Sequence, residues 1–155
     1  MANKFKIYPE LNLFVHYYSG TISMADCANL MYKTMRHRDY RKTMHGLTDM
    51  RHTCMPMMEQ QIDKFNSFAH KCPWIFGKIR GAVLINTTMQ KKMAQIYKKE
   101  DDRFLGKIVN FIDIESALNW LNIPQTAFNE VELFLMSQTL RKDDFKHHPS
   151  NRLST

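Results

Sequence analysis

Glycine is scarce in this chain, and its scarcity excludes the common phosphate-binding loops. Only five glycines occur in 155 residues, whereas nucleotide-binding loops need several glycines close together. The motifs GxGxxG, GxxxxGK(S/T), GxSxG and HExxH are all absent from the sequence. The sequence therefore predicts a protein that is not an enzyme, and it identifies neither a catalytic residue nor a cofactor.

Cysteine and long apolar segments are also scarce. The three cysteines, Cys27, Cys54 and Cys72, are an odd number without a CxxC pair, which favours free thiols in a reducing compartment over a disulfide framework. No stretch approaches the ~20 consecutive apolar residues of a membrane-spanning helix, and no secretory signal follows the N-terminus. We therefore expect a cytoplasmic protein with no membrane span.

Two His-x-Cys pairs raise the question of a zinc site. His52 and Cys54 precede a predicted helix over residues 56–70, and His70 and Cys72 follow it. Four such ligands suit tetrahedral zinc. However, a helix of this length separates the pairs by ~21 Å at 1.5 Å per residue. The sequence therefore predicts no metal site.

The hydropathy pattern alternates strands with helices along a chain of single-domain length. Strands are predicted over residues 4–8, 13–18, 46–49, 80–86 and 107–111. Helices are predicted over residues 23–35, 56–70, 87–99, 114–121 and 131–140. The order β-β-α-β-α-β-α-β-α predicts an α/β fold, a mostly parallel five-stranded sheet with an antiparallel N-terminal hairpin strand and four or five covering helices. We expect one domain over residues 1–140 and a polar, flexible tail over residues 141–155.

Local signals mark the ends and the faces of several of these elements. Ser23 and Asp26 are spaced as a capping box for the first helix, whose inward face is predicted to carry Met24, Cys27, Ala28 and Met31. Asp113 is predicted to cap the short helix that follows the last strand.

Three stretches resemble a known family: residues 46–51 (GLTDMR), 80–85 (RGAVLI) and 109–121 (VNFIDIESALNWL). Together with the element order, they resemble the STAS domain superfamily, in particular its stand-alone SpoIIAA-like members, over residues 4–122. The resemblance implies a non-catalytic regulatory or ligand-carrying module that binds a protein partner or a small molecule. Anti-sigma factor antagonists of this superfamily carry a phosphorylatable serine in Asp-Ser-Ser-Gly. Here the matching segment begins at Asp49 without that motif, and Thr53 is the only hydroxyl nearby.

The segment from Arg51 to Pro56 is the best candidate site, because it joins a strand end to a predicted helix start. Ligands of open α/β sheets bind at the carboxyl ends of strands, and a helix N-terminus attracts anions. The predicted site would take a protein partner or a small ligand with an apolar body and an acidic head. Its residues are Asp49, Arg51, His52, Thr53 and Cys54, with Met55, Met57 and Met58 beside them. The alternative is a connecting loop whose polar groups face water.

Positive charge suggests a second candidate surface. The chain has a formal net charge of +7, and its densest basic run, residues 33–42, includes Arg36, Arg38, Arg41 and Lys42. Such a run can bind nucleic acid or an anionic surface, but the solvated C-terminal end of a helix explains the same residues. No nucleic-acid-binding signature accompanies it, so nucleic acid is not the favoured partner.

Two further alternatives stay open. Cys54 close to a helix start, with Asp49 and His52 nearby, could make a small thiol-dependent enzyme. A homodimer is compatible with the sequence, which does not require one.

Overall fold

The computed structural model describes residues 3–54, 80–88 and 108–144. Its centre is a five-stranded sheet in the order β1-β2-β3-β4-β5. The strands are β1 (Lys4–Tyr8), β2 (Leu13–Thr21), β3 (His45–Cys54), β4 (Gly81–Leu84) and β5 (Ile108–Phe111). β1 and β2 are antiparallel, and every other neighbouring pair is parallel. The predicted fold class is therefore confirmed.

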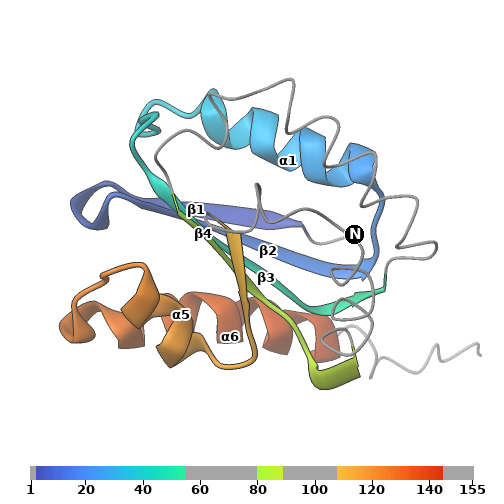
Figure 1. Cartoon of the computed structure of the whole chain (residues 1–155). Helices are drawn as coiled ribbons and strands as arrows, with labels where there is room; N and C mark the ends of the chain where they lie inside the picture. Colours follow the sequence, from blue (N-terminus) through green and yellow to red (C-terminus); the bar gives the residue numbers. More distant parts are fainter. Residues whose placement is uncertain (1–2, 55–79, 89–107, 145–155) are drawn as a thin grey trace, which may run out of the picture.

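Helices cover both faces of this sheet (Figure 1). α1 (Met24–Met35) lies on one face, and α5 (Ile114–Trp120) and α6 (Phe128–Asp144) lie on the other. The predicted helix over residues 56–70, and that over 87–99 except Thr87 and Thr88, lie outside the described residues. No helix in the described part of the chain is long and apolar enough to cross a membrane.

Each face of the sheet has its own apolar core. On the α5–α6 face, β2 contributes Leu13 and Val15, which pack in one cluster with Leu118, Val131 and Leu135 of the helices. On the α1 face, a smaller cluster joins Tyr18, Ile22 and Leu30. Because successive strand residues point to opposite faces, β2 supplies both clusters from neighbouring positions.

The hairpin between β1 and β2 is closed by a short 3-10 turn, Pro9–Leu11. Asn12 follows it in the left-handed region, at φ 51°, which asparagine tolerates better than most residues. Its side-chain Nδ2 donates to the carbonyl of Thr43 at 2.8 Å. The turn is thereby tied to the segment that leads into β3.

The capping box at the start of α1 is confirmed, but the predicted inward face is partly wrong. The Asp26 amide donates to Ser23 Oγ at 3.2 Å, and the Ser23 amide donates to Asp26 Oδ2 at 2.7 Å. The buried residues of the helix are Leu30 and Thr34, whereas Ala28 is exposed. The face of α1 that contacts the sheet is therefore rotated from the predicted face. The prediction counted only apolar residues and so left out Thr34.

Three elements are longer than predicted. β2 continues through Ser19 and Gly20 to Thr21, and β3 continues beyond Asp49 to Cys54, because these two segments pair with each other in parallel. α6 begins at Phe128 and ends at Asp144, four residues into the segment predicted as a tail. The rest of that segment lies outside the described residues.

Gly46 in β3 is required by the packing of Phe14 on β2. A Cβ atom at position 46 would lie 2.6 Å from Phe14 Cζ and 2.8 Å from its Cε2, closer than carbon atoms can approach. Replacing Gly46 with alanine is expected to lower the free energy of unfolding by about 1 to 3 kcal/mol, the usual cost of overpacking a core. Urea denaturation measures this loss. The matched variant Gly20→Ala has open space around its Cβ, so any loss there comes from backbone strain at φ 77°.

Candidate functional site

The end of β3 extends beyond β4 and contains an irregularity. Asp49 is the last β3 residue paired with β4, opposite Leu84. On the other side, Tyr17 lies opposite Asp49 and Ser19 lies opposite His52. β3 therefore has one more residue than β2 between these two pairs, which is a β-bulge, and bulges redirect side chains. The prediction of a loop from Arg51 onward is wrong up to Cys54, because this segment is a paired strand.

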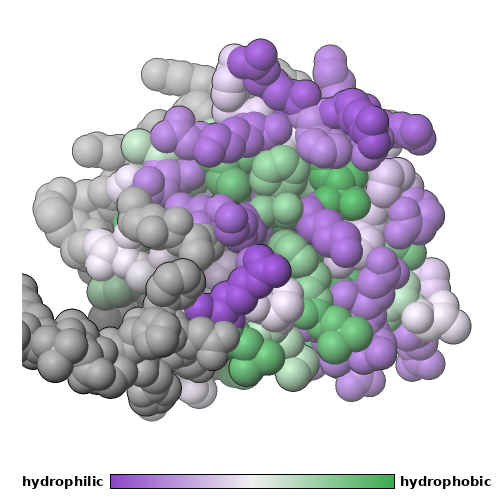
Figure 2. Space-filling view, turned by 180° about the vertical axis from the view of Figure 1, so that it is seen from behind, coloured by the Kyte–Doolittle hydropathy of each residue, from purple (hydrophilic) through white to green (hydrophobic). Residues whose placement is uncertain are grey.

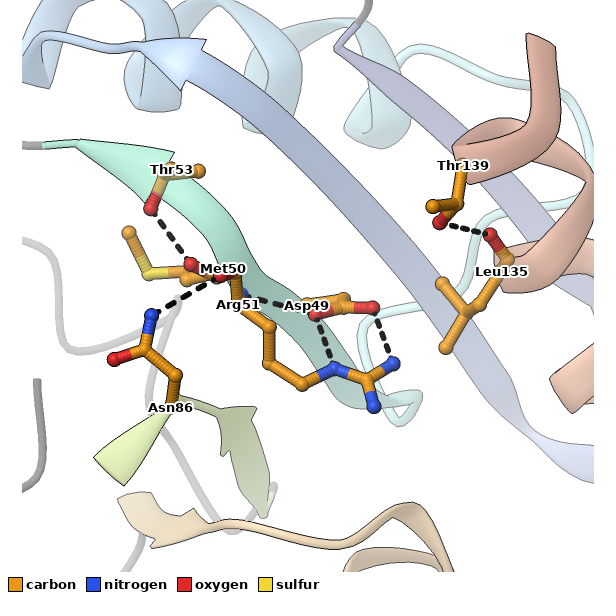
Figure 3. Close-up of polar contacts among 7 residues, drawn as sticks. All are labelled: Asp49, Met50, Arg51, Thr53, Asn86, Leu135 and Thr139. Atoms are coloured by element: carbon orange, nitrogen blue, oxygen red, sulfur yellow. Dashed lines mark hydrogen bonds and ion pairs between the residues drawn. The ribbon is translucent and has the colours of Figure 1, made fainter. Parts of the chain in front are cut away.

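Asp49 and Arg51 form a bidentate ion pair at this bulge (Figure 3). Arg51 Nε donates to Asp49 Oδ1 at 2.9 Å, and Arg51 Nη2 donates to Asp49 Oδ2 at 2.8 Å. The backbone N–H of Arg51 donates to Oδ1 as well, at 3.1 Å. The Asp49 side chain is 1% exposed, whereas that of Arg51 is 32% exposed. The hydrogen bond to Asp49 is the main cause that raises the pKa of Arg51.

Two further residues, neither predicted from the sequence, lie at the same place. Asn86, just after β4, donates from Nδ2 to the backbone carbonyl of Arg51 at 3.2 Å (Figure 3). Tyr17 of β2 is fully buried, and its hydroxyl has no hydrogen-bond partner among the described residues. Its ring lies beside that of the exposed His52, with centroids 6.2 Å apart. The parallel order of β2, β3 and β4 could have indicated both Tyr17 and Asn86 as site residues, because it places the carboxyl ends of the three strands side by side.

Thr53 and Cys54 do not join this group of polar contacts. Thr53 Oγ1 donates to the carbonyl of Met50 at 2.7 Å (Figure 3). Cys54 is exposed at the end of the strand, and its carbonyl accepts the N–H of Ile22 at 3.2 Å. Within the described part of the chain, no acid or base is hydrogen-bonded to the Cys54 thiol. Of the predicted site residues, Asp49 and Arg51 contact each other. His52 lies beside the ring of Tyr17, the β2 residue opposite Asp49.

The basic run lies at the C-terminal end of α1 and in the turn after it. Arg36 packs over the ring of Tyr32, with its Cζ 5.4 Å from the centroid, and its Nη1 donates to the Tyr32 hydroxyl at 3.3 Å. Arg38 is 90% exposed, with its Nε 3.7 Å from Asp39 Oδ1. Arg41 and Lys42 are exposed as well. These positive charges lie where the helix dipole favours them.

The candidate metal ligands are only partly described. His70 and Cys72, with the predicted helix between the two His-x-Cys pairs, lie outside the described residues. Over residues 3–54, 80–88 and 108–144, no group of three or more His, Cys, Asp or Glu side chains could hold a metal ion.

The chain was compared with known families, characterised proteins and solved structures. No known protein family matches the sequence, and no characterised protein is significantly similar to it. A similar solved structure is that of an uncharacterized protein of the DUF3478 family, described as having a SpoIIAA-like fold, from Shewanella loihica PV-4. The two chains are 14% identical with a TM-score of 0.49, over 77% of this chain and 92% of the other. The α/β fold predicted from the sequence, with its mostly parallel five-stranded sheet, is confirmed by the topology of the sheet itself.

Proposed function

We propose that this protein is a non-catalytic binding module that holds a small ligand with a carboxylate head beside Arg51. The observation that carries the proposal is the way Asp49 holds the Arg51 guanidinium. A guanidinium group has five N–H donors in a rigid plane. Asp49 takes one from Nε and one from Nη2, so it leaves unused the edge formed by Nη1 and the second Nη2 hydrogen.

The free edge of the guanidinium determines which ligand fits. Nη1 has no hydrogen-bond partner among the described residues, and about a third of the Arg51 side chain reaches solvent. The Nη1–Nη2 edge matches the two oxygens of a carboxylate in a bidentate pair. Because Asp49 fixes the guanidinium beforehand, a ligand would spend little free energy on ordering it.

Charge in the surroundings favours one carboxylate over a more highly charged group. Asp49 already neutralises Arg51, so the site selects an acceptor by hydrogen-bond geometry more than by net attraction. The exposed His52 ring beside Tyr17 adds a polar group at the same strand end.

Native mass spectrometry of the protein, purified gently from cells, tests this proposal. We expect an extra mass on the wild-type protein that disappears on denaturation. Arg51→Lys keeps the positive charge but loses the planar fork. It should weaken the affinity about tenfold, the equivalent of one charge-assisted hydrogen bond, and so lower the occupancy. The matched control is Arg38→Lys, because Arg38 is a surface arginine away from β3, and it should bind like the wild type.

Either of two results would contradict the proposal. A wild-type protein that carries no added mass would argue against a small ligand. Equal occupancy of the wild type and the folded Arg51→Lys variant would remove Arg51 from the binding site.

A further inference from the structure

The outer face of α6 carries a stripe of exposed apolar side chains. Leu133, Met136 and Leu140 are 55%, 57% and 62% exposed. Their spacing of three and four residues places them on one side of the helix. The opposite side is buried in the core through Val131 and Leu135, at 0% and 2% exposure. Figure 2, which shows the molecule from behind, has several hydrophobic areas among hydrophilic ones in its middle and lower part.

Two other exposed features, on α1 and β1, can be explained without a partner. The exposed ring of Tyr32 on α1 is covered on one side by Arg36. The outer edge of β1 carries Lys4 and Lys6, both exposed, and lysines on edge strands oppose pairing. A two-fold pairing of β1 with a second β1 about its centre would place Lys6 directly opposite its own copy, which is destabilising.

The charges that flank the α6 stripe make it complementary to itself. Glu130 and Arg141 are both exposed. They are eleven positions apart, about three helical turns, so they share one flank of the stripe. When two helices pack antiparallel about a two-fold axis, the same flanks of the two helices face each other. A residue a given number of positions before the axis then contacts the partner residue the same number of positions after it. The midpoint between Glu130 and Arg141 lies just before Met136. The midpoint between Leu133 and Leu140 lies just after it, so the two are one residue apart.

From this coincidence we infer that a second copy of this chain occupies the stripe, through an antiparallel α6–α6 pair centred on Met136. In this pair, Leu133 of each protomer packs against Leu140 of its partner. Glu130 of each protomer lies within reach of the partner's Arg141, so one axis satisfies both the apolar and the charged contacts. Three apolar side chains per protomer make a small interface, so the dimer is weak and depends on concentration.

Sedimentation velocity over a range of protein concentrations tests the apolar part of the interface. The wild type is expected to shift from monomer to dimer as its concentration rises to ~1 mM, the range of a small interface. Met136→Glu places two like charges at the axis and should weaken the dimer at least tenfold. Tyr32→Glu is the matched control, because Tyr32 is 58% exposed on α1, and it should dimerise like the wild type.

A charge exchange tests the orientation of the two helices. Glu130→Arg and Arg141→Glu each place like charges opposite one another in the homodimer, so each variant alone should be mostly monomeric. Mixed in equal amounts, the two variants restore both ion pairs, and native mass spectrometry should detect the heterodimer by its mass. The double variant, with both charges exchanged, should form homodimers again.

The outcomes separate this inference from the binding proposal, because none of the substitutions touches Arg51. A wild type that is monomeric at all concentrations would overturn the inference and assign the stripe to a different partner. A dimer that survives Met136→Glu unchanged would overturn it as well. Failure of the mixed variants to pair would refute the antiparallel geometry.

Discussion

Replacing Arg51 with methionine is expected to lower the free energy of unfolding by about 3 kcal/mol. Asp49 is 1% exposed, and two of its three hydrogen bonds come from the Arg51 side chain. Without them a buried carboxylate loses its counter-charge, and the remaining bond from the Arg51 backbone N–H cannot compensate. Equilibrium urea denaturation at neutral pH measures the loss.

Three companion variants show whether the missing counter-charge is the cause. Asp49→Asn should cost less, because the arginine it leaves unpaired is partly exposed and water can solvate it. The double variant Asp49→Leu/Arg51→Met removes both charges and should recover most of the stability lost by Arg51→Met alone. The single variant Asp49→Leu completes the double-mutant cycle. If its loss and that of Arg51→Met simply add in the double variant, the ion pair is not the cause of the effect.

The parts of the fold that were predicted correctly are those with local signals. The Ser23 capping box and the Asp113 cap each depend on residues within a few positions of one another. Asp113 Oδ1 accepts the N–H of Ser116 at 2.8 Å, as its position before the helix predicts. The apolar run around Ala82 likewise marks a strand of the sheet.

The ends of β2 and β3 could not be predicted because long-range pairing determines them. Ser19, Gly20 and Thr53 have polar or flexible character that is typical of loops, and they are strand residues only because the two segments pair with each other. The bulge shifts the register between Tyr17 and Ser19, so no alternating pattern remains to place Arg51 against Asp49. The sequence therefore predicted a loop from Arg51 to Cys54, where the structure has a paired strand.

The length of α6 was underestimated for a related reason. Its core side, with Val131 and Leu135, and its exposed side, with Leu133 and Met136, are both apolar. Apolar residues on two sides weaken the single-face period that identifies an amphipathic helix. The same two-sided pattern is the one expected of a helix that packs on its own domain and on a second surface.

His16 gives the other large expected effect, a loss of stability in acid. It is 3% exposed in the middle of β2, with Phe14 and Tyr18 rings beside it. Thr34 Oγ1 donates its hydrogen to the Leu30 carbonyl, so His16 Nε2 must donate to Thr34 Oγ1 across their 2.8 Å contact. Burial lowers the pKa of His16 to about 3, so the imidazole is neutral at pH 7 and carries its single proton on Nε2.

The direction of the pH effect follows from this lowered pKa. In the unfolded chain the pKa of His16 is ~6.5, so between pH 6.5 and about 3 the unfolded chain binds a proton that the folded chain does not. The contribution of His16 to stability is complete above pH 6.5 and is lost progressively as the pH falls toward the folded pKa. At pH 4.5 the loss from this residue amounts to about 2 to 3 kcal/mol relative to pH 7.5.

Comparing the wild type with His16→Gln isolates this effect from the other titrating groups. Glutamine can still donate an amide hydrogen to Thr34 Oγ1, and it does not titrate. Urea denaturation of both proteins at pH 7.5 and pH 4.5 should show that the wild type loses about 2 to 3 kcal/mol more than the variant does. Equal losses for the two proteins would mean that His16 takes up a proton in the folded state, which its burial against Thr34 and two aromatic rings opposes.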